Sequence, residues 1–373
     1  MDMAADAQGS FVNDQRPGAN DQLPTHRCVL TIIVPAFDME AWLDDCLSSV
    51  APCPGTSLPP YEVVVVNDGS RDRTSAIAHE WQRRHPNVFR VLDKANGHYG
   101  SCVNAALPLA EGLYVKVLDA DDAFSPEAFA DYLERLAARA ARPDLPDVVV
   151  NDVARWNAEG KPAGECRYAL PPAFGMDALL GCARTITQHA LAYRTALLRQ
   201  MGYRQTEGVP YTDTEWFTLP MAHVRSGVHF DCLLYRYRIQ RPGQSVEASA
   251  YARDVDVLTK MFDRMRAAYL EKTAIATANS AYMLEQLKRL ALLIGSICLL
   301  EVPLRRAEAV FAPFLARVAD LPDVLAELDA ARVFSWSPFP LRHLRLWRRH
   351  PRLRRPLAIL LRAYACLIPR YRG

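Results

Sequence analysis

The stretch Gly112–Pro126, GLYVKVLDADDAFSP, decides how the rest of the chain is interpreted. Its apolar, partly β-branched residues Tyr114–Leu118 predict a short buried strand. The serine–proline pair that ends the stretch is typical of a helix N-terminus. Between strand and helix lie three carboxylates, those of Asp119, Asp121 and Asp122.

These carboxylates come at the carboxyl end of a predicted strand, where ligands bind in open α/β sheets. Three like charges so close together repel one another unless a cation or several hydrogen-bond donors neutralise them. Oxygen ligands of this kind suit Mg²⁺ or Mn²⁺ carrying substrate phosphates. The alternative is a solvated acidic turn without a ligand.

Three more strand–loop–helix units precede this stretch, and their apolar runs predict strands at 29–35, 61–66 and 87–92. Strands that alternate with helices and are apolar throughout predict a doubly wound, mostly parallel α/β sheet with helices on both faces. The loops after the four strands are then expected to meet at one edge of the sheet. These loops are Phe37–Glu40, Asp68–Asp72, Lys94–Gly100 and Asp119–Asp122. No GxGxxG follows the first strand and no Walker A motif is present, which disfavours dinucleotide and P-loop sites.

The segments IIVPAFDMEAWL, VVVVNDGSRDRT, DKANGHYGSCVNAAL and VLDADD resemble the family 2 glycosyltransferases, which have the GT-A fold. The resemblance covers about Leu30–Gln244. It implies a nucleotide-sugar donor, usually a UDP-sugar, a divalent cation, and inversion at the anomeric carbon. Two positions depart from the family pattern: Asp38 stands where Asn is usual, and His98–Tyr99 where Gly-His or Gly-Tyr is usual.

The resemblance also assigns a donor-binding set. Its members are Pro35, Phe37, Glu40, Asp68, Lys94, Asn96, Gly97, Asp119 and Ala120. Asp68 is expected to hydrogen-bond the uracil and Asp119 the ribose, while Asp121 and Asp122 hold the metal. Two alternatives stay open: Asp68 stabilises a turn through its side chain, and Lys94 is a solvated surface lysine.

The second half of the chain contains candidates for the catalytic base. The segment Gly208–Met221, GVPYTDTEWFTLPM, resembles the family's acceptor-end motif and places Asp213 at the base position. Glu215, two residues on, is the rival candidate. The segment Gln188–Leu198 resembles an acceptor-side segment, in which His189 either faces the cleft or is a buried structural histidine.

A further arginine-rich segment, Tyr235–Ser245 or YRYRIQRPGQS, follows. We expect Arg238, Arg241 and Ser245 to close over the diphosphate, since the guanidinium fork pairs with phosphate oxygens. Ordinary loop arginines are the alternative.

Composition and charge outline the domains. We expect a disordered polar tail at 1–27, which has no signal-peptide or transmembrane character, a GT-A domain at 28–245, a helical region at 246–330 and a basic amphipathic tail at 331–373. The longest apolar run, Ala291–Leu300, is shorter than the ~20 residues that a spanning helix needs. The nine scattered cysteines contain no CxxC pair, which favours reduced thiols and a cytoplasmic setting.

The basic tail carries ten arginines and no acidic residue from Leu341 to Gly373, so the rest of the chain has an excess of acidic residues. Anionic lipid headgroups attract such a segment, and Trp347 with the aliphatic residues is expected to enter the membrane interface. Two prolines divide the tail into short pieces. The alternative is that the apolar residues pack onto the body of the protein. Nucleic-acid binding is disfavoured by the acidic body.

These observations predict a metal-dependent inverting glycosyltransferase that acts on a glycan or lipid-linked acceptor in cell-surface polysaccharide assembly, peripheral at the inner face of the plasma membrane. A nucleotidyltransferase is one alternative, but it requires a Gly-rich, basic loop after the first strand, where this chain has PAFDME. A non-catalytic sugar-nucleotide-binding protein is the other.

Overall fold

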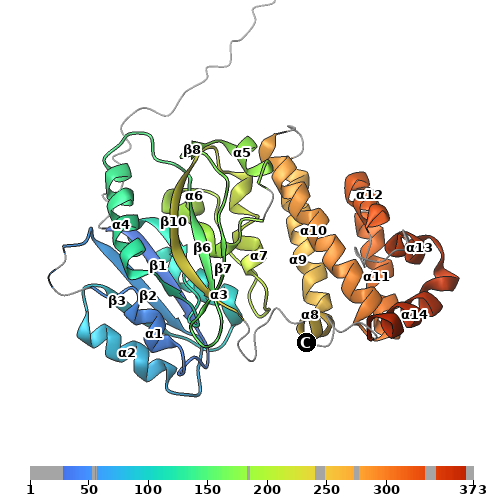
Figure 1. The fold of residues 1–373 in the computed structure, drawn as a ribbon, viewed down its shortest axis with the longest axis horizontal. Helices are drawn as coiled ribbons and strands as arrows, with labels where there is room; N and C mark the ends of the chain where they lie inside the picture. The colour runs from blue at the N-terminus through green and yellow to red at the C-terminus, as the bar shows by residue number, and fades with distance from the viewer. Residues whose placement is uncertain are drawn as a thin grey trace, which may run out of the picture.

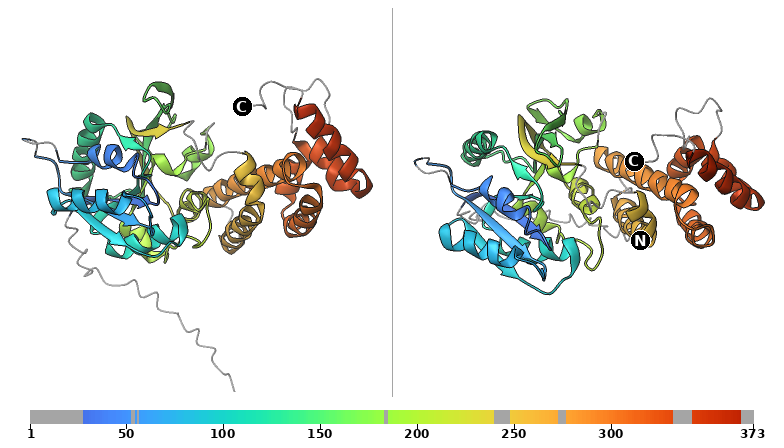
Figure 2. Two further views of the ribbon diagram at one scale, coloured as in Figure 1. Left: turned by 90° about the horizontal axis from the view of Figure 1, so that it is seen from below. Right: turned by 60° about the horizontal axis from the view of Figure 1, so that its bottom comes forward.

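The computed structural model describes residues 28–52, 55, 57–182, 185–239, 248–272, 277–331 and 342–366 (Figure 1). The predicted disordered tail at 1–27 and the candidate phosphate ligands Arg241 and Ser245 lie outside the described residues. The chain forms an α/β domain on one side and a bundle of helices on the other (Figures 1 and 2).

A single ten-stranded sheet organises the α/β domain, with strand order β3-β2-β1-β4-β9-β6-β10-β5 and with β7 on β6 and β8 on β10. Its strands are β1 (Cys28–Ala36), β2 (Tyr61–Asn67), β3 (Phe89–Asp93), β4 (Gly112–Val117), β5 (Ala123–Phe124), β6 (Val148–Trp156), β7 (Pro162–Cys166), β8 (Ala173–Phe174), β9 (Leu191–Arg194) and β10 (Gly227–Arg238).

The sheet has a parallel half and a mixed half. β3, β2, β1 and β4 are all parallel, as the four strand–loop–helix units predict. Their apolar runs are buried on both faces; the side chains of Val63–Val66, for example, are fully inaccessible. β9 then pairs antiparallel with both β4 and β6, while β10 is parallel to β6. The predicted α/β class with helices on both faces is confirmed (Figure 1).

Short helices follow the strands of the α/β domain: α1 (Leu43–Ser48), α2 (Thr74–Arg84), α3 (His98–Ala106), α4 (Pro126–Ala140), α5 (Met176–Leu180), α6 (Thr195–Gln200) and α7 (Asp213–Trp216), with 3₁₀ turns η1 (Leu107–Leu109), η2 (Gln188–Ala190) and η3 (Pro220–Ala222). α4 begins as predicted, with Ser125 at the cap position and Pro126 first in the helix. α3 begins at His98, so the last residues of the loop predicted at Lys94–Gly100 already belong to the helix.

The C-terminal region is helical: α8 (Ala248–Arg253), α9 (Val255–Lys272), α10 (Ala278–Leu300), α11 (Leu304–Val318), α12 (Pro322–Ala330), α13 (His343–Arg349), η4 (Pro351–Leu353) and α14 (Arg354–Cys366). α10 is its centre and contacts α9, α11, α12, α13 and α14 as well as α5 and η3 of the α/β domain. Its buried residues Leu287, Ala291, Ile294 and Cys298 recur at helical spacing. None of the described helices has both the length and the apolar character needed to cross a membrane.

The described part of the basic tail packs onto this bundle. Trp347 is 1% exposed and stacks on Phe311 with ring centroids 4.3 Å apart. The Arg348 guanidinium forms an ion pair with Asp329, and Arg362 donates hydrogen bonds to the carbonyls that end α10. The expectation that Trp347 enters a membrane interface is therefore wrong, because this side chain is already buried within the protein.

Candidate active site

The loops at the carboxyl edge of the sheet surround a cavity of about 290 Å³. The loops after β1 and β4 line one side, and η2, α7 and β10 contribute the other. Its lining residues are Pro35, Met39, His98, Tyr99, Asp119, Ala120, Asp121, Gln188, His189, Pro210, Tyr211, Thr212, Asp213, Tyr237 and Tyr251. The cavity thus unites a predicted donor side with a predicted acceptor side.

A second cavity of about 230 Å³ shares Pro35, Met39, His98 and Tyr99 with the first. It is lined in addition by Ala36, Phe37, Asp68, Asn96 and Cys102. Four of the predicted donor residues therefore gather beside the acidic loop, in a pocket with an apolar wall and a carboxylate: Pro35, Phe37, Asp68 and Asn96.

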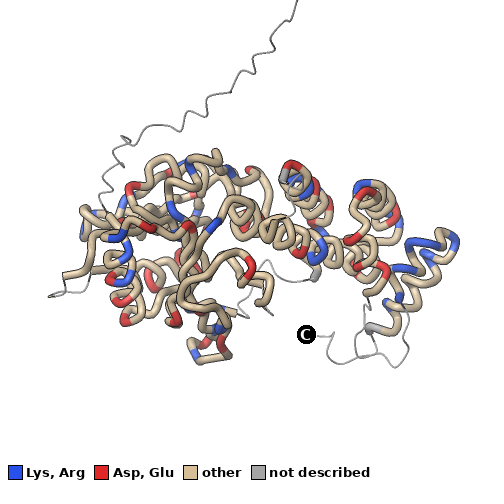
Figure 3. Tube along the Cα trace, turned by 90° about the horizontal axis from the view of Figure 1, so that it is seen from above, with Lys and Arg blue, Asp and Glu red and all other residues tan. Residues whose placement is uncertain are grey.

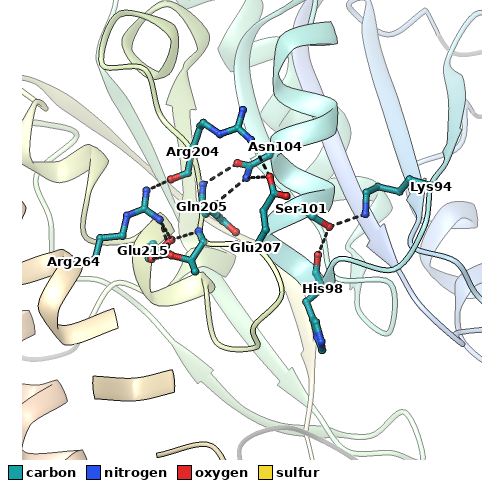
Figure 4. Close-up of polar contacts among 10 residues, drawn as sticks. Lys94, His98, Ser101, Asn104, Arg204, Gln205, Glu207, Glu215 and Arg264 are labelled. Atoms are coloured by element: carbon teal, nitrogen blue, oxygen red, sulfur yellow. Dashed lines mark hydrogen bonds and ion pairs between the residues drawn. The ribbon is translucent and has the colours of Figure 1, made fainter. Parts of the chain in front are cut away.

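Asp68 is buried, and its carboxylate is held by the third loop. Oδ1 accepts hydrogen bonds from Lys94 Nζ at 2.6 Å and from the Gly97 backbone N–H at 3.0 Å. Lys94 also donates to Ser101 Oγ at 2.8 Å (Figure 4), so it is not a free surface lysine. The turn at this place is closed by Asn67, whose Oδ1 accepts a hydrogen bond from the Ser70 N–H at 3.2 Å, rather than by Asp68.

Glu40 does not lie where the resemblance implies. Its Oε2 accepts a hydrogen bond from the Arg73 N–H, and its own N–H donates to Asp72 Oδ2, both at 3.0 Å. Glu40 therefore ties the first loop to the start of α2 and is absent from the lining of both cavities. The expected place of Glu40 in the donor-binding set is not supported by this position.

Three non-glycine residues with positive φ lie in the loops around the site: Asp38 at 52°, His98 at 62° and Tyr211 at 67°. The left-handed region is tolerated by Asn and Asp and is open to Gly. This conformation accounts for both departures from the family pattern, since Asp replaces Asn and His replaces Gly at positions that need it. Tyr211 lies two residues before Asp213, and both residues line the cavity.

The Asp119 carboxylate is held by hydrogen bonds from two other segments of the chain. Tyr99 Oη donates to Oδ1 at 2.8 Å, and Gln188 Nε2 donates to Oδ2 at 2.9 Å. His189 Nε2 lies 3.5 Å from Oδ2, and its ring stacks on Tyr237 with centroids 4.4 Å apart. His189 therefore faces the cavity. Sequence reasoning missed Tyr99, Gln188 and Tyr237. Tyr99 lies in a loop already expected at this edge, whereas only the tertiary fold brings η2 with Gln188 and β10 with Tyr237 to Asp119.

The other two carboxylates of the acidic loop differ in exposure. Asp122 is buried and accepts hydrogen bonds from Tyr235 Oη at 2.9 Å and from the Arg238 N–H at 2.7 Å. Burial, with the charges of Asp121 and Asp119, raises the pKa of Asp122 well above its usual range. Asp121 lines the cavity.

A cation is favoured here on charge grounds. Asp119, Asp122 and His189 each offer one ligand atom, and these atoms lie within 4.8 Å of one another. Carboxylate oxygens with an imidazole nitrogen are ligands that Mn²⁺ accepts. The structure thus adds Asp119 and His189 to Asp121 and Asp122 as candidate ligands.

Asp213 is the first residue of α7 and faces the cavity. Burial and the nearby charge of Asp119 raise the pKa of Asp213 to about 6, although His189 opposes the shift. A carboxylate with such a pKa is ionised near neutral pH yet basic enough to accept a proton in a transition state.

Glu215 lies two residues further along α7 and is absent from the lining of the cavity. It is fully buried, and its two oxygens accept hydrogen bonds from the Thr206 N–H at 2.8 Å, from Thr206 Oγ1 at 2.7 Å and from Arg264 Nη1 at 2.8 Å (Figure 4). Arg264 belongs to α9, so Glu215 joins the α/β domain to the helical region. Its expected role as an alternative base is not supported by this position.

Arg238 also lies elsewhere than expected. Strand alternation sends Tyr235 and Tyr237 to the acidic loop and Arg238 to the opposite side. The Arg238 guanidinium lies 4.2 Å from the ring centroid of Trp42 and 3.7 Å from Asp45. It lines a separate cavity of about 340 Å³ and is not among the residues of the donor cavity.

Lys116 lies beneath the site in β4 and is fully buried. Its ammonium donates to Asn151 Oδ1 at 2.7 Å and to the His189 carbonyl at 2.9 Å, so it anchors η2 under Gln188 and His189. Burial lowers the pKa of Lys116 to about 7. A lysine inside an otherwise apolar strand is the sequence signal that would have revealed it, since buried charges are retained only with partners.

Comparison with known proteins agrees with this geometry. The model of glycosyl transferase family 2 matches residues 31–202. The chain is 32% identical over 121 residues to the uncharacterized glycosyltransferase EpsJ of Bacillus subtilis, covering 32% of this chain and 33% of that protein. It is 25% identical over 268 residues to the uncharacterized glycosyltransferase YibD of Escherichia coli, covering 66% of this chain and 73% of that protein.

Among solved structures, the chain resembles residues 1–349 of Staphylococcus aureus TarS in complex with UDP-GlcNAc, with a TM-score of 0.52 at 18% identity over 87% of this chain and 92% of that one. This likeness extends through the helical region and confirms the GT-A fold. Residues 31–202, which carry the Asp68 and Asp119–Asp122 loops, match the model of glycosyl transferase family 2.

Proposed function

We propose that this protein transfers a sugar from a nucleotide-sugar donor, with a UDP-sugar as the first candidate, to a hydroxyl of a glycan or lipid-linked acceptor, with inversion. The setting is cell-surface polysaccharide assembly at the inner face of the plasma membrane. The observation that carries the proposal is that Asp213 and the acidic loop line one cavity, which continues into the Asp68 pocket.

The donor pocket supports a nucleotide. Phe37 and Pro35 offer apolar surface for a base, while the buried Asp68 and the backbone of the third loop offer polar groups at its edge. An ionised carboxylate can only accept hydrogen bonds, and the N–H groups of a base are suitable donors for it. The TarS structure named above contains UDP-GlcNAc, which makes a UDP-sugar our first candidate.

The cofactor proposed is Mg²⁺ or Mn²⁺, held by Asp119, Asp121, Asp122 and His189. The fit rests on crowded carboxylates, since burial together with the charges of Asp121 and Asp119 raises the pKa of Asp122. When bound, such an ion neutralises negative charge on the donor diphosphate.

The chain's own residues then perform proton transfer and positioning. Asp213 takes the proton of the acceptor hydroxyl as its oxygen forms a bond to the anomeric carbon and the bond to the nucleotide diphosphate breaks. Attack from the face opposite the leaving group inverts that carbon. Tyr99 and Gln188 hold Asp119 in place throughout.

Thermal shift with a panel of nucleotides and nucleotide sugars, with and without Mn²⁺, tests donor binding. We expect UDP to raise the melting temperature only with the cation, because a ligand that binds the folded state stabilises it by mass action. Asp121→Asn should abolish this dependence and sugar transfer, whereas the exposed control Asp231→Asn should keep both. Full transfer in EDTA contradicts the metal proposal, and donor binding without any transfer favours the non-catalytic alternative.

A further inference from the structure

The most exposed large apolar side chains of the described residues lie together near the C-terminus. They are Leu353, Ile359 and Leu360, which are 49%, 57% and 66% exposed. Isolated exposed aliphatic residues are normal on protein surfaces, but a cluster of them marks an interaction site.

The helical period of α14 explains why Ile359 and Leu360 point toward solvent. On α14, residues three or four apart share a face, and Ile359 and Leu360 continue the exposed positions Arg355 and Pro356. The opposite face, with Ala358 and Leu361, is buried against the bundle. α14 is therefore apolar on the side that faces away from the protein as well as on the side that faces it.

Positive charge surrounds this apolar face. Residues 342–366 contain eight arginines and no acidic residue, and Figure 3 shows the basic positions along the end of the helical region. Arg349 and Arg355 are 51% and 61% exposed despite their ion pairs with Asp329 and Glu308. Arg352 is exposed, and no carboxylate of the described residues lies within ion-pair distance of it.

We propose that this outer face of α14 docks onto an anionic lipid surface, with the helix axis in the plane of the membrane. Leu353, Ile359 and Leu360 enter the boundary between headgroups and acyl chains, and Arg352 and Arg355 contact the headgroups. Lipid fits better than a protein partner because the charge is of one sign and lies directly beside aliphatic groups.

The inference extends the proposed function by naming the surface that brings the enzyme to its acceptor. It also replaces the anchor expected from the sequence, since Trp347 is buried and cannot insert. The part-buried contacts of Arg348 and Arg362 hold α13 and α14 on the bundle, and the outer face of α14 is exposed among the described residues.

Flotation with vesicles of equal parts phosphatidylcholine and phosphatidylglycerol, at low salt and without donor, tests the proposal on the full chain. We expect wild type to float and Leu360→Glu to lose roughly tenfold or more in partitioning, since a charge replaces inserted aliphatic groups. The matched control Leu180→Glu replaces a leucine that is 40% exposed on α5 and should float like wild type. Vesicles of phosphatidylcholine alone should bind neither protein strongly.

Equal flotation of wild type and Leu360→Glu, or none by wild type, overturns the proposal, and so does binding to duplex DNA without binding to vesicles. UDP-dependent thermal shift of each variant shows that the fold persists. Because flotation needs no catalysis, transfer to a soluble acceptor without flotation removes only this inference, whereas flotation without transfer in any assay removes the proposed activity.

Discussion

The role of Asp213 is tested by Asp213→Asn, which keeps the shape of the side chain and removes its basicity. The carboxylate lines the cavity next to Asp119 and has a pKa of about 6. General base catalysis contributes about 10²–10⁴-fold, so we expect turnover to fall by at least about 10²-fold, equivalent to about 2.7 kcal/mol of transition-state stabilisation.

The pH dependence of this variant provides a second measurement. Only ionised Asp213 accepts a proton, so wild-type turnover should rise about tenfold per pH unit below its pKa and level off above about pH 6. The residual activity of Asp213→Asn should lack this rise. Release of UDP in a coupled assay, followed from pH 4.5 to 8 with saturating donor (roughly the range over which a group of this pKa titrates), gives both results.

The donor affinity separates catalysis from binding. Asp213→Asn should bind UDP with Mn²⁺ as tightly as wild type, because Asp213 lies on the acceptor side of the cavity. Retention of turnover within about threefold of wild type, or an unchanged pH profile in the variant, would refute the assignment, since the loss expected for a base is about 10²-fold or more.

Two stability predictions follow from packing. Glu215→Gln leaves the donors of Thr206 and Arg264 imperfectly paired, so the free energy of unfolding in urea should fall by about 2–4 kcal/mol. The exposed control Glu134→Gln should change this free energy by less than about 0.5 kcal/mol. An unchanged denaturation midpoint for Glu215→Gln would contradict the pairing of Glu215 with Thr206 and Arg264. Gly100→Ala places a Cβ 2.1 Å from the Thr206 carbonyl oxygen and should lower the free energy of unfolding by about 1–3 kcal/mol. Gly181→Ala, whose Cβ would lie 3.5 Å from its nearest neighbour, should be tolerated. Equal urea midpoints for the two variants would show that α3 shifts freely to make room.

Much of the fold was predictable because its signals are local. Continuous apolar runs define β1, β2 and β4, and a Ser-Pro start defines α4, since burial and helix-cap chemistry act on neighbouring residues. Parallel strands place their carboxyl ends at one edge. The gathering of Asp68 and Asp119–Asp122 at one place therefore followed from the sequence, whereas the role expected of Asp213 came from the family resemblance.

Only the tertiary structure decided which face each side chain presents. Asp213 and Glu215 are two residues apart on α7, which turns one to the cavity and the other to Arg264. Tyr237 and Arg238 are adjacent on β10 and face opposite sides for the same kind of reason. Partners such as Gln188 for Asp119 and Phe311 for Trp347 come from distant segments, and a sequence pattern contains no record of such long-range packing.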